Sequence, residues 1–525
     1  MTLSTGSAGA PVHSPAPSPA LAASPASPSS AADAAHAARS GLLQVLMAFG
    51  QALLFMTQFV ISRLYGAAVY GVYVTSVGIL EVLTRAGFFG ADKSLLRYVA
   101  AHRIAGEPEL EERALGSGIR LATGVSALLA VVLVLGAGSI ATFQGKPELA
   151  GMLRLMAPAI VAAALTRVLA EAMLGAKVVR MNLYVRGLGD PMLLCLCTLV
   201  GAALGAGALR LATAHVIAAC CTSSLAAAAA THVFGRAKLR RALAAPAHPE
   251  LVRFAAPMGI SEAMNAVLQR ADVILLGFFV SREEVGIYAA AEFIGRIIAA
   301  IRYAFDSIAG PVLAEALKTG DRRRLRYNLS LMTRWVTLVS AFVSVTVIAL
   351  RHELLSLYGP LFGAGTGCLV VLALAHLINA CLGLVPWVIA MSGRSRLLLG
   401  NNFGAAILNV TLNLLLVPVY GILGAALAAL LSVTVLQLAF LVETWWLERT
   451  HPFTPSLLKV LVAAAVTGLG EHLIAGRLPG GAGLRVATLV VAGGLTYALA
   501  LVALGLDDEE RQVLGRVLRS LGLRT

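Results

Sequence analysis

Charged residues are scarce in this sequence, and their scarcity excludes an ordinary soluble protein. Only 13% of the 525 residues are Asp, Glu, Lys or Arg, whereas 58% are hydrophobic. Soluble domains are about one quarter charged and about half apolar. The composition therefore predicts an integral membrane protein.

Cysteine is also rare, and all six cysteines fall within apolar segments. Cys195 with Cys197, and Cys220 with Cys221, lack the spacing and the neighbouring histidines of a metal site. We therefore expect them to act as small apolar side chains, and we expect no bound metal.

Sequence motifs of enzymes are missing as well. The chain has no glycine-rich phosphate loop, no zinc-binding spacing and no nucleophile elbow. Its loops are too short to hold a soluble catalytic domain, and no segment interleaves basic and aromatic residues as a nucleic-acid surface would. We therefore expect a transporter that has no catalytic residue, no cofactor and no nucleic-acid partner.

Long apolar stretches run through the chain from residue 41 to residue 505. By the length needed to cross a bilayer, about fourteen of them are expected to be transmembrane helices. The 41 Lys and Arg residues lie mostly in alternate loops and are densest at 236–253 and 318–326. By the positive-inside rule, this asymmetry accounts for the net charge of +14 and places both termini in the cytoplasm.

The two halves of the chain resemble each other. Val69-Tyr70-Gly71-Val72-Tyr73 opens the second apolar span, and Glu284-Val285-Gly286-Ile287-Tyr288 opens the eighth, 215 positions later. Nearly the same offset separates the glycine-rich turns at 204–208 and 421–426. Six spans per half is an even number, so both halves share one orientation in the membrane. The sequence predicts an all-α fold of two six-helix lobes related by a parallel repeat, two further C-terminal helices, and a binding site between the lobes.

These patterns divide the chain into six segments. They are a disordered cytoplasmic tail rich in Ala, Pro and Ser at 1–40, a first lobe at 41–234, a basic cytoplasmic linker at 235–253, a second lobe at 254–446, spans thirteen and fourteen at 447–505, and an amphipathic cytoplasmic helix at 506–525. The first segment has no basic start and no apolar core, so we do not interpret it as a signal peptide.

Charges nonetheless occur inside the expected spans. A charge at membrane depth is costly unless it faces a partner or a water-filled cavity. Pairs with a spacing of four share one helix face and can neutralise each other. They are Glu81–Arg85, Arg167–Glu171, Glu292–Arg296 and Arg302–Asp306. For Arg167–Glu171 and Arg302–Asp306, which lie nearer the cytoplasmic ends, we favour a purely structural ion pair.

A functional interpretation is stronger for the charges that gather between residues 251 and 311. Arg270 and Asp272 lie in one span, and Glu292 and Arg296 lie in the next. The repeat offset maps Glu81 onto Arg296, so equivalent positions of the two lobes carry opposite charges. Guanidinium groups suit bidentate contact with phosphate, so the hypothesis is a central cavity that binds an anionic head group such as a diphosphate. Its substrate-binding residues would be Arg270, Arg296, Arg85, Glu292 and Glu81, with Asp272 as a candidate site for a coupling cation.

Several motifs resemble one transporter family in their order and spacing. In the second half they are Phe254-Ala255-Ala256-Pro257, Asp272 to Gly277, Val285-Gly286-Ile287-Tyr288, and Asn409-x3-Asn413 followed by Val417-Pro418-Val419-Tyr420-Gly421. In the first half they are Tyr70-Gly71-Val72-Tyr73, Gly87-Phe88-Phe89-Gly90 and Leu96-Arg97-Tyr98-Val99. From residue 41 to about residue 443, the chain resembles the polysaccharide transport branch of the multidrug/oligosaccharidyl-lipid/polysaccharide exporter superfamily.

The resemblance implies alternating access between two six-helix lobes around a cationic cavity. The implied substrate is an O-antigen or exopolysaccharide repeat unit on undecaprenyl diphosphate, flipped across the bacterial inner membrane. Such a protein would have membrane lipid, a glycan polymerase and assembly proteins as partners, and it would serve lipopolysaccharide or exopolysaccharide synthesis.

Three alternatives remain open from the sequence. A lipid II flippase is less favoured, since relatives of that kind carry arginines in the first span and this chain has no charge between Arg39 and Arg63. A cation-coupled multidrug antiporter would use Asp272 or Glu292, but such proteins usually have only twelve spans. A membrane-bound glycan polymerase or ligase would need a large external loop.

Overall fold

A computed structural model describes residues 30–475 and 481–505. The chain divides into two compact units, residues 1–46 and 47–525. The described part of the first unit is helical and opens α1 (Ser30–Gly87). This helix begins inside the segment for which a disordered tail was expected, because residues 31–38 are rich in alanine, the strongest helix former. The remaining tail at 1–29 and the expected helix at 506–525 lie outside the described residues.

The described residues form helices, turns and loops, and none of them lies in a β-strand. Eleven helices in this part of the chain are long and apolar enough to cross a membrane, or up to twelve if the two parts of α11 (Arg282–Lys318) form one span. The number is below the expected fourteen, partly because the segment Phe49–Ala105 counts once although it covers two expected spans. Inside that segment, Gly66 breaks the helical path of α1 with a φ of 80°.

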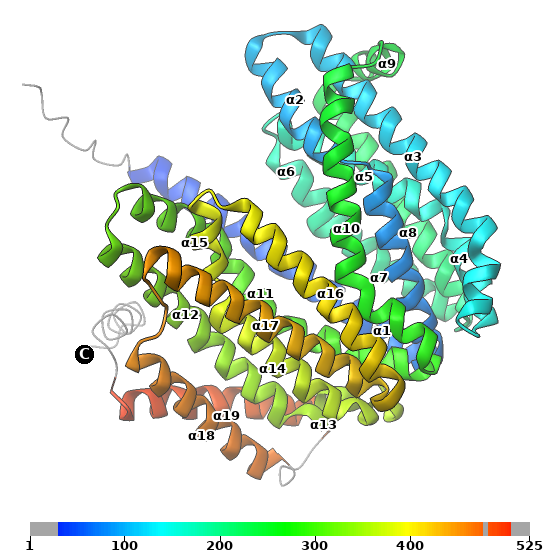
Figure 1. The fold of residues 1–525 in the computed structure, drawn as a ribbon. Helices are drawn as coiled ribbons and strands as arrows, with labels where there is room; N and C mark the ends of the chain where they lie inside the picture. The colour runs from blue at the N-terminus through cyan, green and yellow to red at the C-terminus, as the bar shows by residue number, and fades with distance from the viewer. Residues whose placement is uncertain (1–29, 476–480, 506–525) are drawn as a thin grey trace, which may run out of the picture. The chain divides into compact units, whose positions relative to one another are not determined.

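One group of helices packs around α5 (Pro158–Gly175), which contacts α2, α3 and α8 (Figure 1). The other members of this group are α2 (Ala91–Ala105), α3 (Pro108–Phe143), α4 (Pro147–Met156), α6 (Val179–Asn182), the π-helix η1 (Leu183–Gly189), α7 (Asp190–Ala203), α8 (Ala208–Phe234) and α9 (Arg236–Ala244). Buried Leu95, Leu115, Val168 and Met173 lie in its core.

A second group packs around α14 (Thr366–Leu382), which contacts α11, α12 and α17. The group also contains α12 (Arg322–Ala349), α13 (Arg351–Tyr358), the 3-10 helix η2 (Pro360–Gly365), α15 (Val385–Met391), α16 (Ser395–Tyr420) and α17 (Ile422–Glu448). Outside it, α18 (Pro455–Ala475) packs on α12, and α19 (Ala482–Ala503) packs on α18 and α13 (Figure 1).

The helix α10 (Pro249–Phe279) contacts both groups, because it packs against α2 and α3 as well as against α16. A glycine permits part of this approach. A Cβ on Gly259 would lie 2.6 Å from the backbone carbon of Phe89, in the turn between α1 and α2. The position of α10 matters for the site, since one helix carries residues that face two different cavities.

The two repeated motifs of the sequence pack against each other. Gly71 of α1 and Gly286 of α11 lie where the two helix backbones meet: a Cβ on Gly71 would overlap the carbonyl oxygen of Arg282, and one on Gly286 would overlap that of Ala67. The α11 backbone is fixed at this point by a capping box in which Ser281 and Glu284 satisfy each other's backbone amides. Glycine is required in both motifs because side chains would separate the helices.

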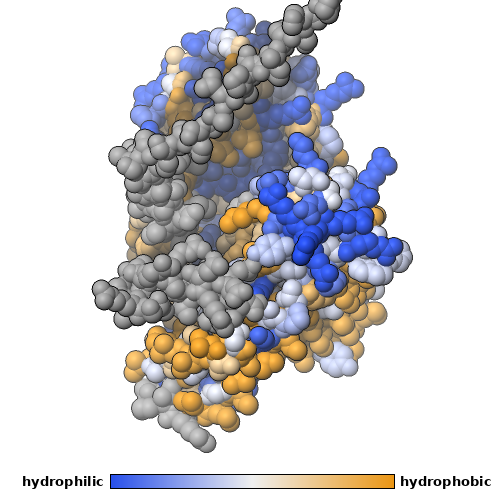
Figure 2. Space-filling model, turned by 90° about the vertical axis from the view of Figure 1, so that its left-hand side faces the viewer, coloured by the Kyte–Doolittle hydropathy of each residue, from blue (hydrophilic) through white to orange (hydrophobic). Residues whose placement is uncertain are grey.

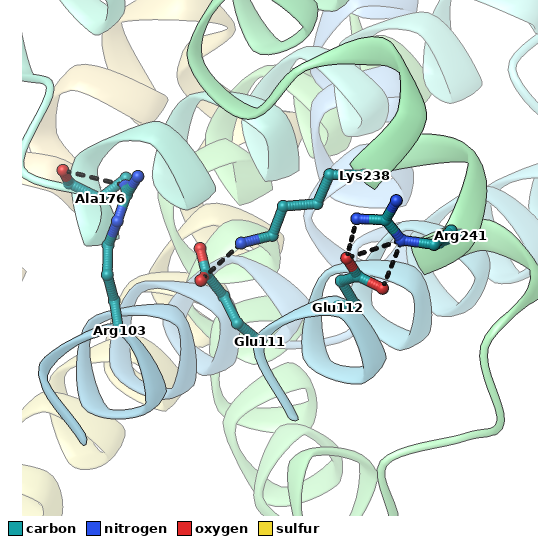
Figure 3. Close-up of polar contacts among 6 residues, drawn as sticks. All are labelled: Arg103, Glu111, Glu112, Ala176, Lys238 and Arg241. Atoms are coloured by element: carbon teal, nitrogen blue, oxygen red, sulfur yellow. Dashed lines mark hydrogen bonds and ion pairs between the residues drawn. The ribbon is translucent and has the colours of Figure 1, made fainter. Parts of the chain in front are cut away.

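The basic linker is held to α3 by ion pairs (Figure 3). Lys238 Nζ lies 2.6 Å from a carboxylate oxygen of Glu111, and Arg241 Nη2 lies 2.7 Å from one of Glu112. The Glu111 side chain is only 5% exposed, whereas that of Arg241 is 63% exposed. Loss of Lys238 would therefore leave a buried carboxylate without its partner, which is costly, whereas exposed pairs contribute only about 0–1 kcal/mol.

Large apolar side chains cover much of the outer surface. The exposed ones include Leu135, Leu196, Leu458 and Leu499. Figure 2 shows hydrophilic residues in the upper and middle parts of one face and apolar residues in its lower part, at the height of α18 and α19. A soluble monomer does not expose apolar surface on this scale, so the chain is a multi-pass membrane protein.

Candidate functional site

All four charge pairs that the sequence spacing predicted are formed. The side chains of each pair lie within 3.4 Å of each other, at 2.8 Å for Glu81–Arg85, 3.3 Å for Arg167–Glu171, 2.9 Å for Glu292–Arg296 and 3.3 Å for Arg302–Asp306. The two residues of each pair lie about one helical turn apart on the same helix, which brings their long side chains together. The pairs differ in what else they contact.

Glu81 joins two helices. Its Oε1 accepts a hydrogen bond of 2.8 Å from Arg85 on the same helix, and its Oε2 accepts one of 2.6 Å from Nε of Arg270 on α10. The three side chains are only about a fifth to a quarter exposed, at 26% for Glu81 and Arg85 and 20% for Arg270. One carboxylate therefore lies between two guanidinium groups, which is the position that an anionic ligand would take.

A second cluster centres on Glu292 in α11. Its Oε1 accepts a hydrogen bond of 2.9 Å from Arg296, and its Oε2 lies 3.3 Å from Nε2 of His376 on α14. Arg270, Glu292 and Arg296 also line one small cavity of about 80 Å³, together with Gln58 and the buried Tyr70 and Tyr73. The structure thus places Arg270, Glu292 and Arg296 around one cavity.

A larger charged cavity of about 430 Å³ lies among α1, α5, α8 and α10. Glu81 and Arg85 line it, and so does Arg167, which we had assigned to a structural pair only. Arg167 does contact Glu171, and its Nε also lies 3.4 Å from Asp92. The ion pair is therefore correct, but the arginine belongs to a cavity wall as well.

Sequence reasoning missed two further residues of this cavity, Arg186 and Asp190. They have the same spacing of four that identified the other pairs, so the signal was present in the sequence. Arg186 lies in the π-helix η1, and Asp190 Oδ1 accepts a hydrogen bond of 3.3 Å from Thr222 on α8. Single π-helical turns occur frequently at functional sites, so η1 supports this cavity as part of the candidate site.

Asp272 is placed apart from the arginines. Its Oδ1 accepts a hydrogen bond of 2.9 Å from Asn413 on α16, and its Oδ2 lies 3.4 Å from the hydroxyl of Tyr288. The Asn413 amide also lies 3.1 Å from Oδ1 of Asn409, and its own Oδ1 is buried and has no hydrogen-bond partner among the described residues. Carboxylate and amide oxygens in this arrangement can hold a proton or a hard cation.

The geometry divides the expected site residues into two sets. Arg85 and Arg270 pair with Glu81, and Arg296 pairs with Glu292, so that the first set forms two groups of ion pairs around the two charged cavities. Asp272 forms the second set, in which it accepts a hydrogen bond from the side-chain amide of Asn413 on α16. The spacing of Asn409 and Asn413 by four residues signals that they share a helix face, but only the structure shows that this face meets α10.

The fold is similar to those of solved membrane proteins. It is similar to the lipid II flippase MurJ in an inward closed conformation, with a TM-score of 0.69 and 13% identity, covering 91% of this chain and 99% of that one. It is also similar to an inward-facing multidrug resistance MATE family transporter of the MOP superfamily, with a TM-score of 0.66 and 12% identity, covering 76% and 94% of the two chains. The chain therefore shares the fold of these two proteins over most of its length.

The family follows from the sequence comparisons. A model described as polysaccharide biosynthesis protein matches residues 37–316, more than half of the chain, and the chain belongs to that family. The probable flippase AglR of Haloferax volcanii is 28% identical over 250 residues, which are 46% of this chain and 51% of that protein. The match thus spans about half the length of this relative.

Proposed function

We propose that this protein is a flippase for oligosaccharides linked to undecaprenyl diphosphate, such as an O-antigen or exopolysaccharide repeat unit. The observation that carries the proposal is the placement of Arg85 and Arg270 on either side of one carboxylate, next to Arg296. Membership of the polysaccharide biosynthesis family and the similarity to a probable flippase support it. Its place would be the bacterial inner membrane, with both termini in the cytoplasm and a glycan polymerase and assembly proteins as partners.

The mechanism is alternating access by two lobes, residues 41–234 and 254–446, that together with residues 447–505 supply fourteen spans. The contact between Gly71 and Gly286 is the point at which the lobes touch closely and about which they would move. Because no covalent bond forms or breaks, the protein's task is to bind the head group on one side and release it on the other.

The diphosphate would bind by replacing Glu81 as the acceptor of the arginine hydrogen bonds. In the structure, the Glu81 carboxylate accepts hydrogen bonds from both guanidinium groups, so neither arginine is an unpaired charge at membrane depth. A diphosphate presents several oxygens to planar N–H donors. Competition between an internal carboxylate and the substrate also makes release possible, since the site closes on itself afterwards.

Coupling to a cation is a second part of the proposal. Asp272 with Asn409, Asn413 and Tyr288 offers the oxygen atoms that a proton or Na⁺ requires, and it lies on the same helix as Arg270. The same cluster favours the second candidate function, a cation-coupled antiporter for multidrug substrates. A lipid II flippase is a third candidate, to which the arginine cluster would apply equally.

The test uses a bacterial host that lacks its own glycan flippase. The chain is expressed with several host glycans in parallel, and the leaflet that holds the undecaprenyl-linked oligosaccharide is measured. We expect movement to the periplasmic leaflet, lost in Arg270→Gln and Arg296→Gln. The control is Arg240→Gln, because Arg240 is exposed on α9 and distant in sequence from the cluster.

The outcomes separate the candidates. Movement of lipid II alone would replace the proposed substrate with lipid II, and tolerance of the host to cationic dyes that depends on Asp272 would favour the antiporter. Normal movement in both arginine variants, at normal expression, would contradict the assignment of the site.

A further inference from the structure

A third cavity differs from the charged ones in size and in chemistry. It has a volume of about 1020 Å³ and lies among α10, α11, α14, α16 and α17. Ligand-binding cavities typically have volumes of about 300–1,000 Å³, so this one is large enough for an extended ligand. Among the described residues that line it, none is acidic and one, Arg396, is basic.

Carboxamide side chains are unusually concentrated in its wall. They are Asn265 and Gln269 on α10, Asn379 on α14, Asn402 and Asn409 on α16, and Gln437 on α17. A carboxamide carries both hydrogen-bond donors and acceptors, and it is costly at membrane depth unless it faces a partner or water. Six of them from four helices therefore indicate a hydrated cavity built for a polar, uncharged ligand.

One buried residue of the cavity wall has an acceptor without a partner among the described residues. Gln437 is 4% exposed, and its Nε2 donates a hydrogen bond of 2.8 Å to Oδ1 of Asn379. Its Oε1 is buried and has no hydrogen-bond partner among the described residues. A buried polar atom left without a partner is rare in folded proteins, and a hydroxyl donor from a ligand would satisfy it.

Two aromatic rings complete the wall. Tyr303 on α11 and Phe403 on α16 are 58% and 47% exposed although both line the cavity. The guanidinium of Arg302 lies 4.4 Å from the ring centre of Tyr303, which fixes one face of that ring and leaves the other available. Flat rings beside hydrogen-bonding amides match the alternating C–H faces and hydroxyl edges of a sugar.

We propose that this cavity binds the neutral glycan portion of the lipid-linked substrate, separately from the arginine cluster that binds the diphosphate. This inference rests on the proposed function. The helix α10 connects the two sites, because Glu262 faces the charged cavity while Ser261 and Asn265 face the amide cavity. One substrate can therefore place its diphosphate and its sugars on either side of the same helix.

The experiment titrates the full-length protein in lipid nanodiscs with two diphosphate diesters of equal charge: the methyl ester of undecaprenyl diphosphate, which is the sugarless probe, and undecaprenyl diphosphate carrying an oligosaccharide that contains N-acetylglucosamine. The cavity variant is Asn265→Leu with Gln437→Leu. Its control is Asn401→Leu, which removes the carboxamide next to Asn402 on α16. The Asn401 amide donates a hydrogen bond of 2.7 Å to Glu443, and Asn401 does not line the cavity. The single variant Asn265→Leu, at an exposed position, is measured alongside in case the double variant does not fold.

We expect the wild-type protein to bind the sugar-bearing probe about tenfold more tightly, the value of one or two net hydrogen bonds. The cavity variant should lose this difference and keep its affinity for the sugarless probe, while the control keeps both. Equal affinity of the wild-type protein for both probes would overturn the inference. The inference would also be overturned if the cavity variant bound the sugarless probe more tightly than the wild-type protein does, because the cavity would then hold the polyprenyl chain.

A failure of the proposed function can be distinguished from a failure of the glycan cavity. If the wild-type protein binds neither lipid probe, the diphosphate site is refuted, and the free oligosaccharide is then titrated alone. Binding of the free oligosaccharide that is lost in the cavity variant would still support the glycan cavity. No binding of it would refute the cavity as well.

Discussion

The substitution Glu81→Gln tests whether the arginine cluster is organised by one carboxylate. Glutamine has nearly the same shape but no charge, so Arg85 and Arg270 would lose their shared anionic acceptor. Hydrogen bonds to charged groups contribute about 1.5–3 kcal/mol each. Because the side chains are 20–26% exposed, partial solvation places the cost near the lower end, at about 2 kcal/mol or roughly thirtyfold in the folding equilibrium.

The measurement is thermal unfolding in lipid nanodiscs, arranged as a double-mutant cycle with Arg270→Gln. We expect each single variant to be less stable than the wild-type protein and the double variant to lose less than the sum, with a coupling of about 1 kcal/mol or more. The matched control is Glu148→Gln, whose pair with Arg282 is 40–49% exposed and should contribute about 0.5 kcal/mol at most. The proposed function adds that Glu81→Gln raises the affinity for undecaprenyl diphosphate.

Two results would refute this reasoning. Additive costs in the cycle would show that Glu81 and Arg270 do not depend on each other. A loss of stability no larger than that of the Glu148→Gln control would show that the cluster is solvated as freely as the surface.

Three further predictions follow from contacts described above. Gly71→Ala should destabilise the protein by about 1–3 kcal/mol or more, because the added Cβ would overlap backbone atoms of α11. Gly78→Ala should be tolerated, since the nearest atom to its Cβ would be a side-chain carbon at 3.8 Å. Equal unfolding temperatures of the two variants would contradict this prediction. Lys238→Ala should cost more stability than Arg241→Ala, because only the former leaves a buried carboxylate unpaired, and a reversed order would be evidence against the assignment. Burial, with a neighbouring histidine, lowers the pKa of His248 below its usual 6.5, so the unfolded chain binds more protons below that pH and stability should fall as pH falls from 7 to 5. His248→Asn should flatten that dependence of the unfolding temperature, and an unchanged slope would argue that another group is responsible.

Much of the helical architecture could be predicted from the sequence because composition and span length are local properties. The break at Gly66 falls just before Val69, where the second span was expected to open, but this glycine could not be singled out as the residue that breaks the helix, since nothing in its neighbours distinguishes it from glycines that stay helical. The start of α1 at Ser30 was missed because a segment rich in Ala, Pro and Ser was treated as uniform, although its alanine-rich end favours helix.

The site was predictable in its residue types but not in its connections. Spacing by four residues identified Glu81–Arg85 and Glu292–Arg296, because that relation lies within one helix. The hydrogen bond between Glu81 and Arg270 joins residues 189 positions apart, so no periodic pattern within one helix could predict it. The amide cavity was missed for the same reason, since its six carboxamides come from four helices and each looks unremarkable alone.

The pairing of charges in the arginine cluster has an electrical consequence. The three arginines Arg85, Arg270 and Arg296 and the two carboxylates Glu81 and Glu292 together carry one net positive charge. A bound diphosphate diester, with about two negative charges, would reverse that sign. A membrane potential, negative inside, acts on each moving charge with about 2.3 kcal/mol per 100 mV. The same membrane potential would therefore favour outward movement of the site when it holds the diphosphate and inward movement after release. Both steps of the transport cycle would then be driven by one constant potential.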